Sequence, residues 1–154
     1  MRAVIQRVSK ASVSIDGEVV GTCDQGLLVL LGIGEGDSEP EVEQLWTKIF
    51  KMRIFPDGAH HTGAALADVK GEVLVVSQFT LYADCRKGNR PSFSSAGAPD
   101  ESARLYELFV KRACRDATHV ECGEFGADMQ VSLVNDGPFT ICLDTDELKR
   151  PRRG

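Results

Sequence analysis

The sequence has few of the residues on which common hydrolase chemistries depend. It contains only three histidines, two of them adjacent at His60 and His61, and it has no G-x-S-x-G and no H-E-x-x-H motif. Triad hydrolysis and zinc-dependent proteolysis are therefore poorly supported. Cys114, His119 and Cys122 match no common zinc spacing, and a fourth ligand is missing. We expect no metal and no cofactor, and any catalysis would use hydroxyls, backbone N–H groups and the substrate's own groups.

Long apolar runs and an excess of positive charge are also lacking. The longest apolar run, Leu27–Leu31, is too short to span a bilayer, and Met1–Arg7 lacks the apolar core of a signal peptide. The net charge of -5 provides no overall basic field that would attract nucleic acid. The five cysteines are odd in number and include no C-x-x-C pair, which predicts reduced thiols, most of them in the core, and a cytoplasmic protein.

The length and composition are those of one globular domain with a real core. The chain has 154 residues, of which 42% are hydrophobic and 27% are charged. We expect a single domain over residues 1–154, in which the residues from about 146 to 154 form a basic tail. Taken alone, that tail is better explained as a disordered, solubilising end than as a binding site.

Hydrophobic periodicity predicts strands in the first third of the chain and two main helices after it. Residues 2–15 alternate, and Asp16-Gly17 is a typical two-residue hairpin turn, so this part is expected to form antiparallel sheet. Ser38, followed by acidic residues and Pro40, predicts a helix start, and Trp46 falls on that helix's apolar face. A second helix is expected to begin at Pro99–Ser102.

The segment Gly71–Phe93 has the pattern around which the rest of the chain is organised. Val73–Val76 predicts a strand buried on both faces, and Ser77–Leu81 then places two hydroxyls and an amide at its carboxyl end. A basic, Gly- and Pro-containing loop follows, with Arg86, Lys87 and Arg90. This order suits an anionic substrate, whose phosphate the loop would hold. On these residues alone, a core strand with a solvated turn is the preferred interpretation.

A second unusual segment lies at Asn135–Pro138. It interrupts two alternating stretches, 130–135 and 139–143, and turn chemistry alone favours a plain hairpin there. A proline between paired strands removes a hydrogen-bond donor and therefore needs an explanation. A Gly-Pro bond can also adopt the cis state at modest cost, which would point two carbonyls the same way.

Taken together, Ser77–Leu81 and Asn135–Thr140 make the chain resemble the D-aminoacyl-tRNA deacylases. The flanks Met1–Val8, Leu27–Gly34 and Lys87–Phe93 contribute to the resemblance. It implies a homodimer of a compact α/β fold with a mostly antiparallel, barrel-like sheet and two main helices. It also implies hydrolysis of the ester between a D-amino acid, or glycine, and the terminal adenosine of tRNA.

The resemblance assigns roles to the residues of the first motif. Gln78, Phe79 and Thr80 would be catalytic, and Ser77 would line the adenosine and ester pocket with them. Four more residues would frame the adenine: Phe125, Gly126, Ala127 and Met129. Thr80 is either the nucleophile or takes no direct part in the reaction. In the second case the 2′-hydroxyl of the tRNA adenosine assists hydrolysis. We favour the second, because no base is visible to activate Thr80, and because we expect the side chains of Gln78 and Thr80 to face opposite ways.

The same resemblance makes Gly137 and Pro138 the chiral filter. Their peptide bond would be cis and would reach into the partner subunit's site, where its carbonyl oxygens exclude an L side chain. Arg7 matches a residue that holds this motif. The tRNA phosphates would contact Arg86, Lys87 and Arg90. Phe139 stands where the family usually has valine, which bears on fine substrate preference and not on the class.

Two alternatives stay open. One is a paralogue that removes a mischarged small L-amino acid from tRNA, for which the bond before Pro138 would be trans. The other is a non-catalytic RNA-binding module that uses the Arg86–Arg90 loop. It ranks low, because the chain is acidic and its sequence reveals no aromatic platform for bases.

Overall fold

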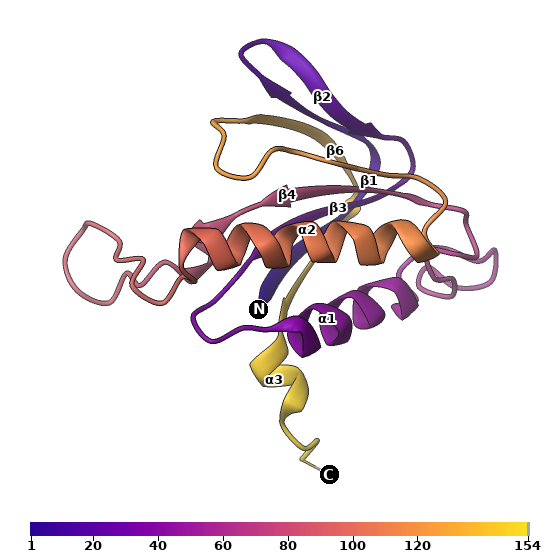
Figure 1. Cartoon of the computed structure of the whole chain (residues 1–154). Helices are drawn as coiled ribbons and strands as arrows, with labels where there is room; N and C mark the ends of the chain where they lie inside the picture. The colour runs from indigo at the N-terminus through magenta and orange to yellow at the C-terminus, as the bar shows by residue number, and fades with distance from the viewer. Residues whose placement is uncertain (154) are drawn as a thin grey trace.

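The sheet is organised around one long strand that pairs with three others. The computed structural model describes residues 1–153, and Figure 1 shows the strands curving over two long helices. The central strand is β1 (Arg2–Ile15), and all three of its pairings are antiparallel. Its partners are β2 (Glu18–Cys23), β3 (Gly26–Gly32) and β6 (Gln130–Asp144).

Two further strands make the sheet mixed. From β3 the sheet continues through β4 (Glu72–Ser77) to β5 (Val120–Cys122), and both of these pairings are parallel. A parallel connection needs a crossover, which here is provided by α1 (Glu39–Lys51) and α2 (Pro99–Asp116). The predicted α/β class with two main helices is confirmed, whereas "mostly antiparallel" is corrected to a mixed sheet.

The two ends of this sheet approach each other. The strand order is β2-β1-β3-β4-β5, with β6 paired to β1 outside this path. The backbone N–H of Thr22 on β2 donates to the Glu121 carboxylate on β5 at 3.2 Å. The sheet is therefore nearly closed and barrel-like.

The predicted central strand is buried on both faces. Val73 and Val75 of β4 pack in the core cluster beneath the helices, and Leu74 and Val76 pack in a second cluster inside the curved sheet. None of the four is more than 2% exposed. The short β-branched-rich run therefore predicted this strand correctly, because both of its faces meet apolar layers.

The start of α1 also agrees with the sequence. The backbone N–H and the hydroxyl of Ser38 both donate to the Glu41 carboxylate at 2.8 Å, which closes the first turn. Trp46 is fully buried, packs edge-on against Phe109, and donates through Nε1 to Asp116 at 2.9 Å. Trp46 therefore joins α1 to α2 within the core.

The cysteines differ from expectation. All five thiols are free, but Cys23 alone is buried, and Cys85, Cys114 and Cys142 are exposed. Cys114 directly follows the buried Ala113 on α2, so it lies just outside the apolar stripe. The prediction that most cysteines lie in the core is wrong.

The predicted hairpin at Asn135–Pro138 is also wrong, because β6 runs through this segment. Asn135 pairs with Val8 and Thr140 pairs with Gln6, so both flanks lie on the same strand, β1. Residues 136–139 then oppose the single residue Arg7. The segment is thus a large bulge, a place where a strand tolerates a proline without a backbone donor.

The C-terminal part is more ordered than a tail from residue 146. Helix α3 (Thr145–Lys149) follows β6 directly, and Thr145 is fully buried. The Met1 ammonium donates to the Thr145 hydroxyl at 2.8 Å, and Lys149 pairs with Glu41 at 2.6 Å. Over residues 1–153, no helix is long and apolar enough to cross a membrane.

Candidate active site

The first motif leaves its strand and forms a short helical turn. Strand β4 ends at Ser77, and the 3₁₀ helix η1 (Phe79–Tyr82) follows at once. The Gln78 side-chain amide donates to the Thr80 hydroxyl. The prediction that these two side chains face opposite ways is therefore wrong: residues two apart share a face on a strand, and in the turn of η1 the two side chains also meet.

A cavity of about 540 Å³ opens beside this turn, a volume typical of ligand sites, which span about 300–1,000 Å³. The end of β4 and the segment between β5 and β6 form two of its sides. Seven of the predicted site residues line it: Ser77, Gln78, Phe79, Phe125, Gly126, Ala127 and Met129. Gly126 has a φ of +80°, a backbone conformation that favours glycine. Two segments separated by nearly fifty residues in sequence thus face one space, whereas Thr80 lies outside its lining.

Tyr106 of α2 lines the cavity and hydrogen-bonds to the main chain at its wall. Its buried hydroxyl is shared between the carbonyl oxygens of Val75 and Gly123, at 3.2 and 2.8 Å. Burial raises the pKa of Tyr106, so the hydroxyl stays a neutral donor. Its ring centroid lies 5.9 Å from that of Phe125. Tyr106 therefore fixes the ends of β4 and β5 relative to each other, a role that no local sequence pattern indicates.

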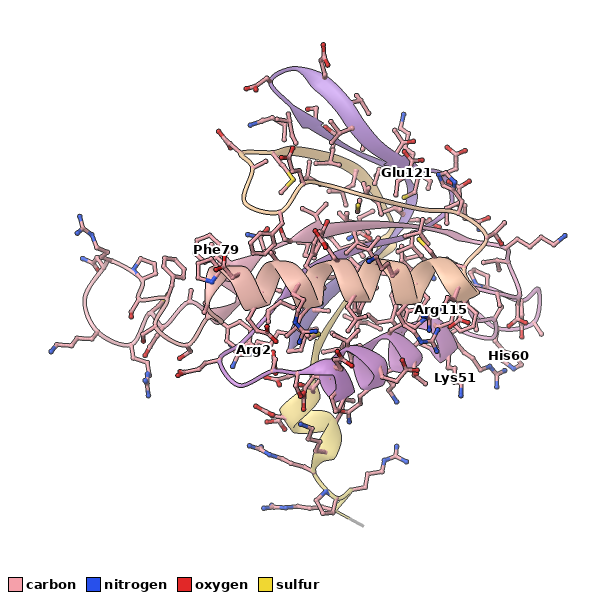
Figure 2. All side chains as sticks on the ribbon, in the orientation of Figure 1. Arg2, Lys51, His60, Phe79, Arg115 and Glu121 are labelled. Atoms are coloured by element: carbon pink, nitrogen blue, oxygen red, sulfur yellow. The ribbon has the colours of Figure 1, made fainter. Side chains whose placement is uncertain are left out.

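Arg2 supports the η1 turn from the opposite side, and sequence reasoning missed it. Its Nη1 donates to the Leu81 carbonyl at 2.9 Å, and its Nε donates to the Asp144 carboxylate at 2.9 Å. The guanidinium carbon also lies 4.4 Å from the centre of the Tyr82 ring. Figure 2 shows Arg2 below α2, on the same side of the molecule as Phe79. These partners are 79 and 142 residues away in sequence, so no local pattern could indicate them.

The bulge in β6 is held by Arg7. The peptide bond between Gly137 and Pro138 is cis, and both residues are exposed. Arg7 is only 8% exposed, and its Nε donates to the Asp136 carbonyl at 3.0 Å. Its guanidinium carbon lies 4.7 Å from the centre of the Phe139 ring. Phe139 therefore places an aromatic ring against the side chain that holds the bulge.

The basic loop projects from the domain beyond the first turn of α2 (Figure 1). Asp84 and Ser92 close its base through two backbone hydrogen bonds of 2.7 and 2.9 Å. Arg86, Lys87 and Arg90 are exposed on it, and Arg86 also pairs with Asp84 at 2.6 Å. The three cations are thus presented to solvent by a loop with a closed base.

A family model for D-Tyr-tRNA(Tyr) deacylase matches residues 4–144 of the chain. This chain belongs to the D-aminoacyl-tRNA deacylase family. A D-aminoacyl-tRNA deacylase from Lactobacillus gasseri is 57% identical over 144 residues, which are 94% of this chain and 99% of the relative. One from Ruegeria sp. (strain TM1040) is 53% identical over 154 residues, 100% of this chain and 99% of the relative.

A solved structure named c-Myc DNA Unwinding Element Binding Protein has the same fold. It matches with a TM-score of 0.89 and 39% identity, over 94% of this chain and 98% of its own. The predicted family, and with it the predicted class of hydrolase, is confirmed by the family model and the full-length relatives.

In this deacylase the predicted residues fall into two separate groups. The cavity holds one group, but among residues 1–153 neither Arg7 nor Gly137 nor Pro138 lines it. The exposed bulge therefore does not complete the cavity of its own chain. Within the described part of the chain, no cluster of His, Cys, Asp or Glu could hold a metal ion.

The deacylase also has an aromatic pair that sequence reasoning overlooked. Phe79 of η1 and Phe93, just beyond the basic loop, are 57% and 37% exposed, and both line the cavity. Their ring centroids lie 5.0 Å apart, with the ring planes at 68°. Sequence reasoning overlooked this pair because the two rings meet only in the folded chain.

Proposed function

We propose that the chain hydrolyses the ester of D-aminoacyl-tRNA, and of glycyl-tRNA, and releases the free amino acid and the tRNA. The observation that carries this proposal is the shared cavity, where the β4 end faces Phe125–Met129. Ser77, Gln78 and Phe79 would bind the ester and ribose, and Phe125, Gly126, Ala127 and Met129 would frame the adenine. Such a substrate places the enzyme in the cytoplasm, where aminoacyl-tRNA is used.

Backbone N–H groups at the start of η1 are the proposed oxyanion hole. The first hydrogen bond inside this turn runs from Leu81 N–H to the Gln78 carbonyl. The N–H groups of Phe79 and Thr80 precede that bond, so they have no partner within the turn. Donors placed in this way stabilise the oxygen of an ester carbonyl as water attacks it.

We propose that Thr80 is not the nucleophile. Its hydroxyl contacts the Gln78 amide, which cannot remove a proton. None of the three histidines lines the cavity formed by the described residues. We propose that the 2′-hydroxyl of the terminal adenosine assists water, which supplies OH to the acyl carbon while a proton passes to the ribose oxygen.

The chiral filter is proposed to be Gly137-Pro138 of a second subunit. The bulge is exposed, is anchored by Arg7, and leaves the cavity of its own chain untouched. Leu133 and Val134, on the same strand, expose apolar surface that a subunit contact would cover. In the proposed homodimer, the two carbonyls of the bulge would occupy the space that an L side chain needs. The phosphates of the tRNA would meet Arg86, Lys87 and Arg90.

The test is the rate of tyrosine release from D-Tyr-tRNA and from L-Tyr-tRNA. We expect release from the first and little from the second, and equal rates would refute the proposal. The variant Gly137→Ala should lose chiral rejection or activity, because an added Cβ would lie 3.0 Å from Arg7 Nη2. Sedimentation tests the homodimer separately, and a monomer with full selectivity would rule out a filter lent by a second subunit.

One alternative has an observation in its favour. The solved structure with a TM-score of 0.89 is named for binding a DNA element, so nucleic-acid binding without catalysis is the second candidate. Tight binding of tRNA or DNA with no ester cleavage would favour it. The paralogue that removes a small L-amino acid was expected to have a trans peptide before Pro138, and the bond is cis.

A further inference from the structure

Two exposed phenylalanine rings stand at the mouth of the cavity. Of the seven phenylalanines, only Phe79 and Phe93 are exposed, by 57% and 37%. The rings contact each other edge to face, with centroids 5.0 Å apart. Figure 2 shows Phe79 beside the amino-terminal end of α2, and Pro99 of that end lines the same cavity. Exposed aromatic surface at a cavity mouth marks a binding surface.

The base of the basic loop lies next to Phe93 in the chain. Phe93 directly follows Ser92, which closes the loop together with Asp84. Arg86, Lys87 and Arg90 lie within that loop and are exposed. Aromatic faces next to cations are the combination by which proteins bind single-stranded nucleic acid, through base stacking and phosphate contacts.

We propose that Phe79 and Phe93 form a stacking platform for the nucleobase that precedes the terminal adenosine of tRNA. This inference rests on the proposed function, which fills the interior of the cavity with the aminoacylated adenosine. Phe125–Met129, on another side of the cavity, would hold the adenine. The RNA chain must then leave through the mouth, where the next base meets the exposed rings. Its phosphates continue toward Arg86 and Arg90.

The expected effect is confined to substrates that carry this base. Base–aromatic stacking contributes enough affinity that removing one ring should weaken productive binding about 5- to 100-fold. Phe93→Ala should therefore lower kcat/KM for D-Tyr-tRNA by about that factor. It should leave kcat/KM for D-tyrosyl-adenosine, which ends at the terminal nucleoside, within about twofold.

The experiment compares three variants on both substrates. Phe93→Trp keeps a stacking face and should restore activity on D-Tyr-tRNA. Val20→Ala is the matched control, because Val20 is an exposed apolar residue on β2, away from the cavity lining. It should behave as the unchanged protein does on both substrates.

A second readout does not depend on catalysis. A tRNA with 2-aminopurine next to its terminal adenosine should lose fluorescence on binding, and Phe93→Ala should abolish that quenching. Quenching without ester cleavage would support the stacking platform and refute the proposed function. Cleavage without quenching would refute the platform alone.

Three further outcomes would overturn the platform. Equal losses on D-Tyr-tRNA and D-tyrosyl-adenosine would mean that Phe93 only supports the η1 turn. No loss on either substrate would mean that the ring contacts nothing that matters for binding. A change in oligomeric state on sedimentation of Phe93→Ala would mean that the pair belongs to a subunit contact.

Discussion

Replacing Arg7 by methionine should lower the free energy of unfolding and weaken the selectivity for D- over L-aminoacyl-tRNA. The side chain is nearly buried and its guanidinium donates to the carbonyls of Asp136 and Ile54, at 3.0 and 2.7 Å. It also covers one face of the Phe139 ring. Methionine fills the space of the stem but donates nothing, so both carbonyls lose a charged donor.

The magnitude follows from these contacts. Each hydrogen bond to a charged group is worth about 1.5–3 kcal/mol, and Arg7→Met removes two of them. We therefore expect Arg7→Met to lower the free energy of unfolding by about 3–5 kcal/mol. Urea unfolding measures this directly. The matched control is Arg104→Met, whose half-exposed guanidinium pairs with Glu101 and Glu39 on the surface; this change should lower the free energy of unfolding far less.

The second readout is the ratio of kcat/KM for D-Tyr-tRNA to that for L-Tyr-tRNA. A bulge without its anchor excludes the L side chain less firmly, and the ratio should fall about tenfold for each 1.4 kcal/mol of exclusion lost. If Arg7→Met unfolds as Arg104→Met does and keeps its selectivity, Arg7 does not hold the filter. The bulge would then depend on Asn135, whose side chain accepts from Phe139 N–H at 2.8 Å.

Three other changes test single features of the structure. Ser102→Ala should leave the free energy of unfolding unchanged or raise it by up to about 1 kcal/mol, because the Ser102 hydroxyl is buried without a partner among the described residues. Thermal unfolding measures this, and a clear loss of stability would contradict it. Tyr106→Phe should lower stability by about 1–2 kcal/mol and slow deacylation, because two main-chain carbonyls lose their shared donor; wild-type melting and rates would contradict this. The hydrogen bond from Lys149 lowers the pKa of Glu41 from 4.5 to about 2, so its contribution to stability is complete above pH 4.5 and is lost as the pH falls toward 2. Unfolding midpoints from pH 6 to pH 2 should show a smaller loss in Glu41→Gln, and equal slopes in both proteins would contradict the assignment.

Elements with a strong local pattern could be predicted without the fold. The apolar run Val73–Val76 indicates a strand buried on both faces, and its two faces do meet apolar layers. Ser38 and Glu41 mark a helix start, because the residues that form the capping hydrogen bond are only three positions apart. The two short motifs, with their order and spacing, were sufficient to indicate the family. Each of these signals lies within a few residues of chain.

The errors arose where a contact joins distant parts of the chain. Asn135–Pro138 has the composition of a hairpin turn, yet its two flanks pair with one strand more than 120 residues earlier, and the turn chemistry serves a bulge. Lys149 reads as part of a basic tail until Glu41 binds it from α1.

The amino-acid sequence by itself determined the secondary structure of the core and, through its two motifs, the family. The tertiary structure alone decided which residues share a surface: the cavity between β4 and the 125–129 segment, the Arg2 and Arg7 anchors, and the pair of exposed rings. The physical reason is range. Propensity, capping and periodicity act over one or two turns of chain, whereas a site forms where a nearly closed sheet brings distant segments together.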